Sequence, residues 1–159
     1  MSSLWRLQMA DRRASPLSPE SVWRTLSDTS SWGQWNPHQP VFCGSFRAGE
    51  RVWVSVKLGP LSSLAPAKVV VCEPPHRIEW QGGLPGLLLV RHGFTLQAAE
   101  GGGCQLEHHE SFAGLLVPLI AWLLRPLLGR VYGETSQALL EAASRGELPA
   151  PPAPLGGAG

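Results

Sequence analysis

The sequence predicts an α+β fold in which a curved antiparallel sheet of about seven strands wraps around one long C-terminal helix. Residues 115–145 are the longest apolar-periodic stretch of the chain. The residues before them fall mostly into short stretches that alternate between apolar and polar side chains. A helix this apolar needs cover, and only these strands can provide it. We therefore expect the sheet to close over the helix with a cavity between them.

The N-terminal segment predicts a strand followed by two short helices. Residues 5–10 alternate between apolar and polar side chains, which indicates a strand with one buried face. Ser18 and Pro19 suit the N-cap and the first position of a helix that extends to about Ser27. Residues 29–34 predict a second short helix or turn.

Six further strands are expected before the C-terminal helix, at residues 41–46, 51–57, 68–72, 77–81, 88–97 and 105–112. In the first of these hairpins, Phe46 is expected to oppose Val52, and Phe42 to oppose Val56. In the last hairpin, a turn centred on Gly101 pairs Leu96 with Leu106, Phe94 with His108, and His92 with Glu110. A slip of one residue would exchange the two faces, so this last register is strongly specified.

The C-terminal helix is expected to have two different halves. Pro118 suits a first helical position, whereas Pro126 cannot donate to the carbonyl of Trp122, which predicts a kink or a break. The ten apolar residues 115–124 are too few for a membrane span, which needs roughly 20. Transient contact with a membrane surface is compatible with them. The second half is amphipathic, with one apolar face for the sheet.

Composition and charge limit the classes of protein to which the chain can belong. The chain has 159 residues, of which 43% are apolar, and its net charge of +1 without a basic cluster argues against nucleic-acid binding. Residues 1–145 are predicted to form one domain, and the Pro- and Gly-rich residues 146–159 a disordered tail. The first residues lack the apolar core of a signal peptide, so we expect a cytoplasmic protein, monomeric or dimeric.

No metal site and no cofactor is predicted. Cys43, Cys72 and Cys104 are widely spaced, which favours neither a disulfide framework nor a zinc site, and we expect three buried or half-buried thiols. The Glu-His-His-Glu run at residues 107–110 lies on an expected strand, where alternate side chains face opposite ways and cannot present four ligands together. Phosphate-binding and nucleophile motifs do not occur.

Three polar residues, His92, His108 and Glu110, are predicted to point from the last hairpin into the apolar cavity. A carboxylate there is costly unless it is paired. Three interpretations stay open: the groups satisfy one another or are solvated, they orient the head group of a ligand, or they act as acid and base. These three residues are the catalytic candidates, and none is firm.

The expected ligand-binding residues come from the strands nearest the C-terminal helix and from the first half of that helix. They are Trp80, Val90, His92, Phe94, His108, Glu110, Phe112, Leu119, Trp122 and Leu123. Among the tryptophans, Trp80 and Trp122 are expected to line the cavity, because an indole combines an apolar ring with one N–H donor.

Six short stretches occur in a characteristic order: SVWRTLSD at 21–28, SWGQWNP at 31–37, GSFRAG at 44–49, PPHRIEWQG at 74–82, RHGF at 91–94 and HESFAG at 109–114. Together they resemble the START-related superfamily, also called SRPBCC, over about residues 2–145. Each stretch alone has low specificity, and their joint order carries the resemblance. The resemblance implies the helix-grip fold.

The resemblance also implies a cavity for a small hydrophobic ligand, because relatives include polyketide cyclases and dehydrases, coenzyme-Q-binding proteins, lipid-transfer domains and chaperone activators. Fold does not fix function among them. We expect a protein that binds or transports a lipid, quinone or polyketide-like molecule. Two alternatives stay open: a polyketide cyclase or dehydrase that uses Glu110 with His92 or His108 as acid and base, and a module that docks residues 115–128 on a protein or a membrane.

Overall fold

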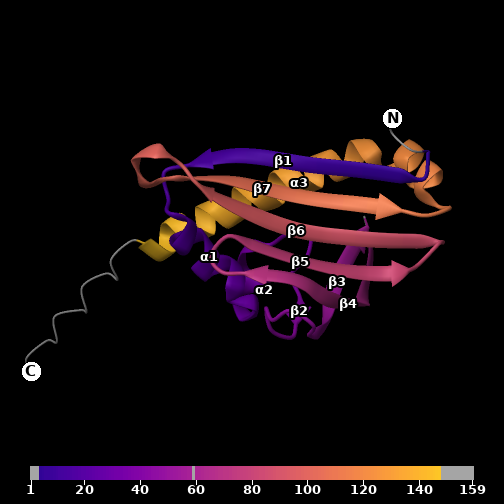
Figure 1. Ribbon diagram of the computed structural model, residues 1–159, viewed down its shortest axis with the longest axis horizontal. Helices are drawn as coiled ribbons and strands as arrows, with labels where there is room; N and C mark the ends of the chain where they lie inside the picture. Colours follow the sequence, from indigo (N-terminus) through magenta and orange to yellow (C-terminus); the bar gives the residue numbers. More distant parts are fainter. Residues whose placement is uncertain (1–3, 59, 148–159) are drawn as a thin grey trace, which may run out of the picture.

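The order of elements in the computed structural model, which describes residues 4–58 and 60–147, confirms the predicted fold class (Figure 1). The strands are β1 (Arg6–Ser15), β2 (Phe42–Cys43), β3 (Arg51–Leu58), β4 (Leu61–Glu73), β5 (Arg77–Leu84), β6 (Leu88–Ala98) and β7 (Cys104–Ala113). They form one antiparallel sheet in the order β1-β7-β6-β5-β4-β3-β2. The long helix α3 (Val117–Glu147) lies across one face and contacts β1 and β7.

Two short helices lie between β1 and β2, as predicted. Helix α1 (Pro19–Ser27) begins after Ser18, whose side chain accepts a hydrogen bond from the backbone N–H of Ser21 at 3.2 Å. A 3-10 turn (Thr29–Ser31) leads directly into the one-turn helix α2 (Trp32–Trp35). Helix α1 buries Val22 and Leu26 and packs against α3, so it closes one end of the space between sheet and helix.

The first predicted hairpin is wrong in length and in register. Strand β2 has only two residues, and Phe42 pairs with Val54 rather than with Val56. The reason is Gly44, whose φ of +127° takes the backbone out of the extended conformation directly after Cys43. Because Cys43 alternates with the buried Phe42 on this edge strand, its thiol is exposed, which corrects the expected burial.

The last hairpin has the predicted register. Leu96 pairs with Leu106, Phe94 with His108, and His92 with Glu110. A short 3-10 turn at Glu100–Gly102 joins the strands, with Gly101 at a φ of +83°. The regular alternation of side chains in β6 and β7 therefore delivers alternate residues to the concave face that α3 covers.

The predicted break at Pro126 is wrong, because α3 continues without interruption to Glu147. Pro126 and Trp122 both lie on the exposed side of the helix. The Trp122 carbonyl that loses its helical hydrogen bond can therefore be satisfied by water. A kink at this point stays a prediction. The helix includes the first two residues of the predicted tail, and the remainder, 148–159, lies outside the described residues.

The core consists of two apolar clusters. The larger one is centred on Trp32, which is fully buried and donates its indole N–H to the carbonyl of Leu26 at 2.9 Å. The smaller one joins Phe112 of β7 to Val117 and Leu128 of α3. No helix within residues 4–58 and 60–147 is long and apolar enough to cross a membrane.

Candidate functional site

A cavity of about 320 Å³ lies between the sheet and α3 and touches both core clusters. Its walls are mostly apolar. They come from β3 and β4 (Val54, Val56, Ala67), from β5 and β6 (Trp80, Leu88, Val90), from β7 (Phe112) and from α3 (Ile120, Leu128, Val131). Ligand pockets in proteins span about 300–1,000 Å³, so this cavity suits a small molecule.

Four side chains form a polar cluster on the cavity wall: His92, His108, Glu110 and Tyr132. His92 lies on β6, and His108 and Glu110 lie on β7, where alternation directs them toward α3. Tyr132 reaches the same place from the buried face of α3. All four side chains are nearly buried, Glu110 being the most exposed at 12%.

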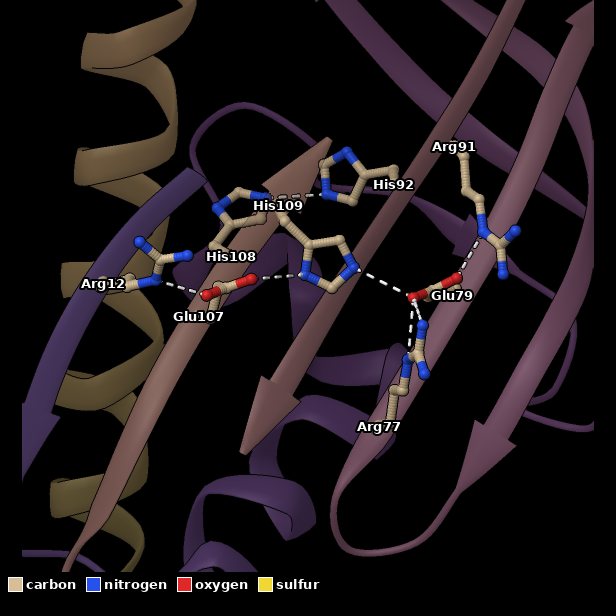
Figure 2. A network of polar contacts seen from close by, with 8 residues as sticks. All are labelled: Arg12, Arg77, Glu79, Arg91, His92, Glu107, His108 and His109. Atoms are coloured by element: carbon tan, nitrogen blue, oxygen red, sulfur yellow. Dashed lines mark hydrogen bonds and ion pairs between the residues drawn. The ribbon is translucent and has the colours of Figure 1, made fainter. Parts of the chain in front are cut away.

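The polar cluster is one continuous chain of hydrogen bonds. His108 Nδ1 lies 3.4 Å from the backbone oxygen of Tyr132, and His108 Nε2 lies 2.8 Å from His92 Nε2. His92 Nδ1 lies 3.2 Å from Glu110 Oε1, and the Tyr132 hydroxyl donates to Glu110 Oε2. Figure 2 shows the contact between the two imidazoles.

The hydrogen bonds of this chain need one proton more than two neutral imidazoles and an ionised carboxylate carry. A hydrogen bond between His108 Nδ1 and the carbonyl of Tyr132 assigns the hydrogen of His108 to Nδ1, because a carbonyl only accepts. A neutral His108 then accepts at Nε2, so His92 Nε2 carries hydrogen. The contact between His92 Nδ1 and Glu110 needs a further proton, which either residue can hold. In both forms the cluster is electrically neutral, as a nearly buried site requires.

Burial fixes the charge states at the two ends of the chain. Burial and the neighbouring His92 hold the pKa of His108 well below its ordinary value of 6.5, so its imidazole is neutral. Burial and the nearby Glu110 carboxylate raise the pKa of Tyr132, so its phenol remains a proton donor at physiological pH. The extra proton therefore belongs to the His92–Glu110 pair.

The lowered pKa of His108 predicts how stability depends on pH. The unfolded chain takes up a proton at His108 below about pH 6.5 and the folded chain does not, so the free energy of unfolding falls as the pH falls. Between about pH 7 and pH 5 wild type should lose up to about 2 kcal/mol more than His108→Gln. Urea unfolding at both pH values measures this difference. Equal losses in the two proteins would contradict the assignment of a neutral, buried His108.

Six of the ten expected ligand-binding residues line the cavity: Trp80, Val90, His92, His108, Glu110 and Phe112. Phe94 does not line it, but stacks on the ring of His108 with centroids 4.3 Å apart. Leu119, Trp122 and Leu123 do not line it, and they are 56%, 80% and 60% exposed. The first half of α3 is apolar all round, so periodicity does not reveal that Ile120 and Leu128 form its inner face.

Sequence reasoning missed Tyr132 as a member of the site. The amphipathic pattern assigns it only to the apolar face of the second half of the helix. The available signal was chemical: a buried tyrosine needs a partner for its hydroxyl, and Glu110 is a carboxylate facing the same space. Thr135 lies one turn further along α3 and also lines the cavity.

A second polar cluster lies on the opposite, convex face of the sheet and was not predicted. Glu79 of β5 is only 3% exposed, and it accepts hydrogen bonds from Arg77 and Arg91 while facing His109 Nε2 at 3.2 Å. Figure 2 shows these side chains meeting at the Glu79 carboxylate. Burial alone would raise the pKa of Glu79, but the two arginines outweigh it and lower that pKa. Glu79 is therefore an ionised anchor for three side chains.

Gly93 makes this second cluster possible. It lies between Glu79 and His109 in one row across β5, β6 and β7. A Cβ atom at this position would come within 2.6 Å of Glu79 Cγ and 2.9 Å of His109 Nε2. The absent side chain leaves the space in which Glu79 and His109 meet.

The described residues contain no group of three or more His, Cys, Asp or Glu side chains that could hold a metal ion. The run at residues 107–110 divides as its alternation predicts. Glu107 and His109 face the convex side, while His108 and Glu110 face the cavity.

A curved sheet that encloses an apolar cavity with one long helix defines a protein of the helix-grip class. The chain belongs to the polyketide cyclase / dehydrase and lipid transport family, whose model matches residues 6–145. A search of curated protein sequences found no match.

Solved structures share the fold at low sequence identity. The Zhui aromatase/cyclase from Streptomyces sp. R1128 has a TM-score of 0.71 and 15% identity, over 88% of this chain and 94% of that chain. Hypothetical protein jhp0584 from Helicobacter pylori has a TM-score of 0.73 and 15% identity, over 86% and 88%. TTHA0849 from Thermus thermophilus has a TM-score of 0.67 and 15% identity, over 89% and 100%.

Proposed function

We propose that the protein binds, and by binding transports, a small hydrophobic ligand in the cavity between the sheet and α3. The observation that carries this proposal is the cavity itself, which has apolar walls and one polar cluster. Each methylene group moved from water to such walls contributes about 0.8 kcal/mol. That gain is offset by the cost of ordering the ligand, so a molecule that fills most of the cavity is favoured.

Native mass spectrometry after gentle purification tests this proposal. We expect an apolar molecule to co-purify with the protein, and the emptied protein to take up a fluorescent lipid analogue. A protein that is empty as purified and takes up no analogue would contradict it.

A second candidate function is acid–base catalysis, and the extra proton of the His92–Glu110 pair favours it. A pair that shares one movable proton can accept a proton from the carbon next to a bound carbonyl, through the free lone pairs of Glu110. The family description includes cyclases and dehydrases. An enolisable polyketide-like molecule would be the substrate.

For this second candidate, Glu110→Gln should lower kcat on such a substrate by about 10²–10⁴-fold, because the amide cannot hold the proton. The matched control is Glu107→Gln, on the same strand but on the convex face. Turnover by Glu110→Gln equal to that of the control would dismiss the catalytic role.

The proposed function also needs a route by which the ligand reaches the cavity, and an exposed apolar surface next to it supports contact with a membrane. We define this surface, the apolar patch, as Leu84, Leu87, Leu115, Leu119, Trp122 and Leu123. Backbone hydrogen bonds from Leu115 to Gly86 and from Leu116 to Leu87 join its two segments. The inner face of the same helix carries Ile120 on the cavity wall, so patch and cavity share one element.

Charge favours a lipid bilayer with anionic head groups as the partner of the apolar patch. No Asp or Glu occurs between Ser111 and Gly133, whereas Arg125 is exposed beside Trp122 and Leu123. Interfacial helices have this composition: their leucines reach the acyl chains, a tryptophan lies at the interface, and a basic residue lies near the phosphates.

A further inference from the structure

We propose that the cavity selects a neutral ligand whose polar end is a hydrogen-bond donor, a hydroxyl or an N–H group, and rejects ligands that end in a carboxylate. This inference rests on the proposed binding function and adds the chemistry of the head group. It follows from which hydrogens and lone pairs of the polar cluster are already used.

Every N–H and O–H of the polar cluster already has an acceptor inside the protein. His108 Nδ1 donates to the carbonyl of Tyr132. One hydrogen lies between the Nε2 atoms of His92 and His108, and one lies between His92 Nδ1 and Glu110. The Tyr132 hydroxyl donates a hydrogen bond to Glu110 Oε2. Moving the extra proton between His92 and Glu110 changes none of this, so the cluster has no donor left for a ligand.

Lone pairs that can accept a hydrogen bond from a ligand, by contrast, remain free. When His92 holds the extra proton, each carboxylate oxygen of Glu110 can accept two hydrogen bonds and accepts one from the polar cluster. When Glu110 holds it, Oε1 donates to His92, and Oε2 still has one lone pair for a ligand. Thr135 Oγ1, which lines the same cavity, donates its hydrogen to the carbonyl of Val131 at 2.9 Å and keeps its lone pairs. The polar cluster and Thr135 therefore accept hydrogen bonds from a ligand and donate none.

A ligand carboxylate would bring only lone pairs and a negative charge to this surface. To bind there it must first take up a proton. For an acid with a pKa of about 4.3, only about 1 molecule in 500 is protonated at pH 7. An alcohol or phenol needs no such step, and its O–H complements the Glu110 oxygens directly.

Three probes that differ only in the group on one naphthalene ring test the inference on the wild-type protein: naphthalen-2-ol, 2-methoxynaphthalene and 2-naphthoate. Isothermal titration calorimetry measures their affinities. The naphthol should bind most tightly. The ether, which lacks the donor, should bind roughly 10–100-fold more weakly, as expected for a lost hydrogen bond to a charged group. The naphthoate should bind at least ~100-fold more weakly at pH 7 and gain up to about tenfold for each pH unit toward pH 5. The naphthol serves as the reference at each pH.

Glu110→Gln adds an amide N–H donor to the cavity, and it should reduce the preference for naphthol over naphthoate at least ~10-fold. Glu107→Gln is the matched control. Gln39 and Lys57 also line the cavity and carry N–H donors. If they held a ligand carboxylate away from the polar cluster, Glu110→Gln would leave the preference unchanged.

The outcomes separate the two proposals. If none of the three probes binds, the proposed binding function itself is overturned. If the ether or the naphthoate binds wild type as tightly as the naphthol at pH 7, the inference about the head group fails and the binding function stands. The probe series uses only the wild-type protein, so it does not depend on the folding of a variant.

Discussion

Replacing Val90 with tryptophan is expected to weaken ligand binding by at least ~100-fold while leaving the fold intact. Val90 lies on β6 and points into the cavity, whose volume is about 320 Å³. An indole there occupies space that the ligand needs and removes the apolar surface it would bury. Extra atoms destabilise a packed core by about 1–3 kcal/mol, but here an empty space receives them. Calorimetry with naphthalen-2-ol and the melting temperature measure the two quantities.

Leu89→Trp is the matched control, because it makes the same kind of change one residue away on the opposite face of β6. It should bind the probe as wild type does. Equal binding by Val90→Trp and Leu89→Trp would show that the ligand sits elsewhere, and the cavity would lose its assigned role.

Leu123→Glu is expected to abolish the binding of the protein to vesicles of phosphatidylcholine and phosphatidylserine. Leu123 is 60% exposed on the apolar patch. Burial of one leucine in a bilayer interface contributes about 1.5–3 kcal/mol, which corresponds to roughly 10–100-fold in affinity, and the new carboxylate is repelled by anionic lipid. Flotation of the protein with vesicles measures the bound fraction.

The control for this second prediction is Ser144→Glu, which introduces the same charge at an exposed position near the other end of α3. It should float with vesicles as wild type does. If wild type does not float, or if both variants float as it does, the patch is not a membrane surface. Self-association of wild type that Leu123→Glu disrupts, without any flotation, would identify a second copy of the chain as the partner instead.

Local signals were strong enough to predict most of the fold from the sequence. The start of α1 followed from the chemistry of Ser18 and Pro19, and the register of the last hairpin followed from strict alternation on both sides of Gly101. Because that register was correct, the meeting of His92 with Glu110 was also predicted. Family resemblance added the helix-grip arrangement, which the family match and the sheet order confirm.

The remaining features depend on tertiary context that the pattern of residues does not contain. The apolar first half of α3 predicts burial on every side, yet only the face with Ile120 meets the sheet, and Trp122 is exposed. Tyr132 joins the polar cluster through the rotation of α3 over β7, which no local signal defines. The burial of Glu79 depends on the gap at Gly93, and that gap became visible only once three strands were in register.

Two consecutive residues of β6 take part in side-chain contacts on opposite faces of the sheet. His92 is bound within the polar cluster, and Gly93 sits beneath the ion pairs of Glu79 on the other side. The centre of the sheet is thus held by side-chain contacts on both of its faces. We therefore expect the centre of the sheet to move least when a guest molecule enters or leaves, and the two-residue edge strand β2 to move more.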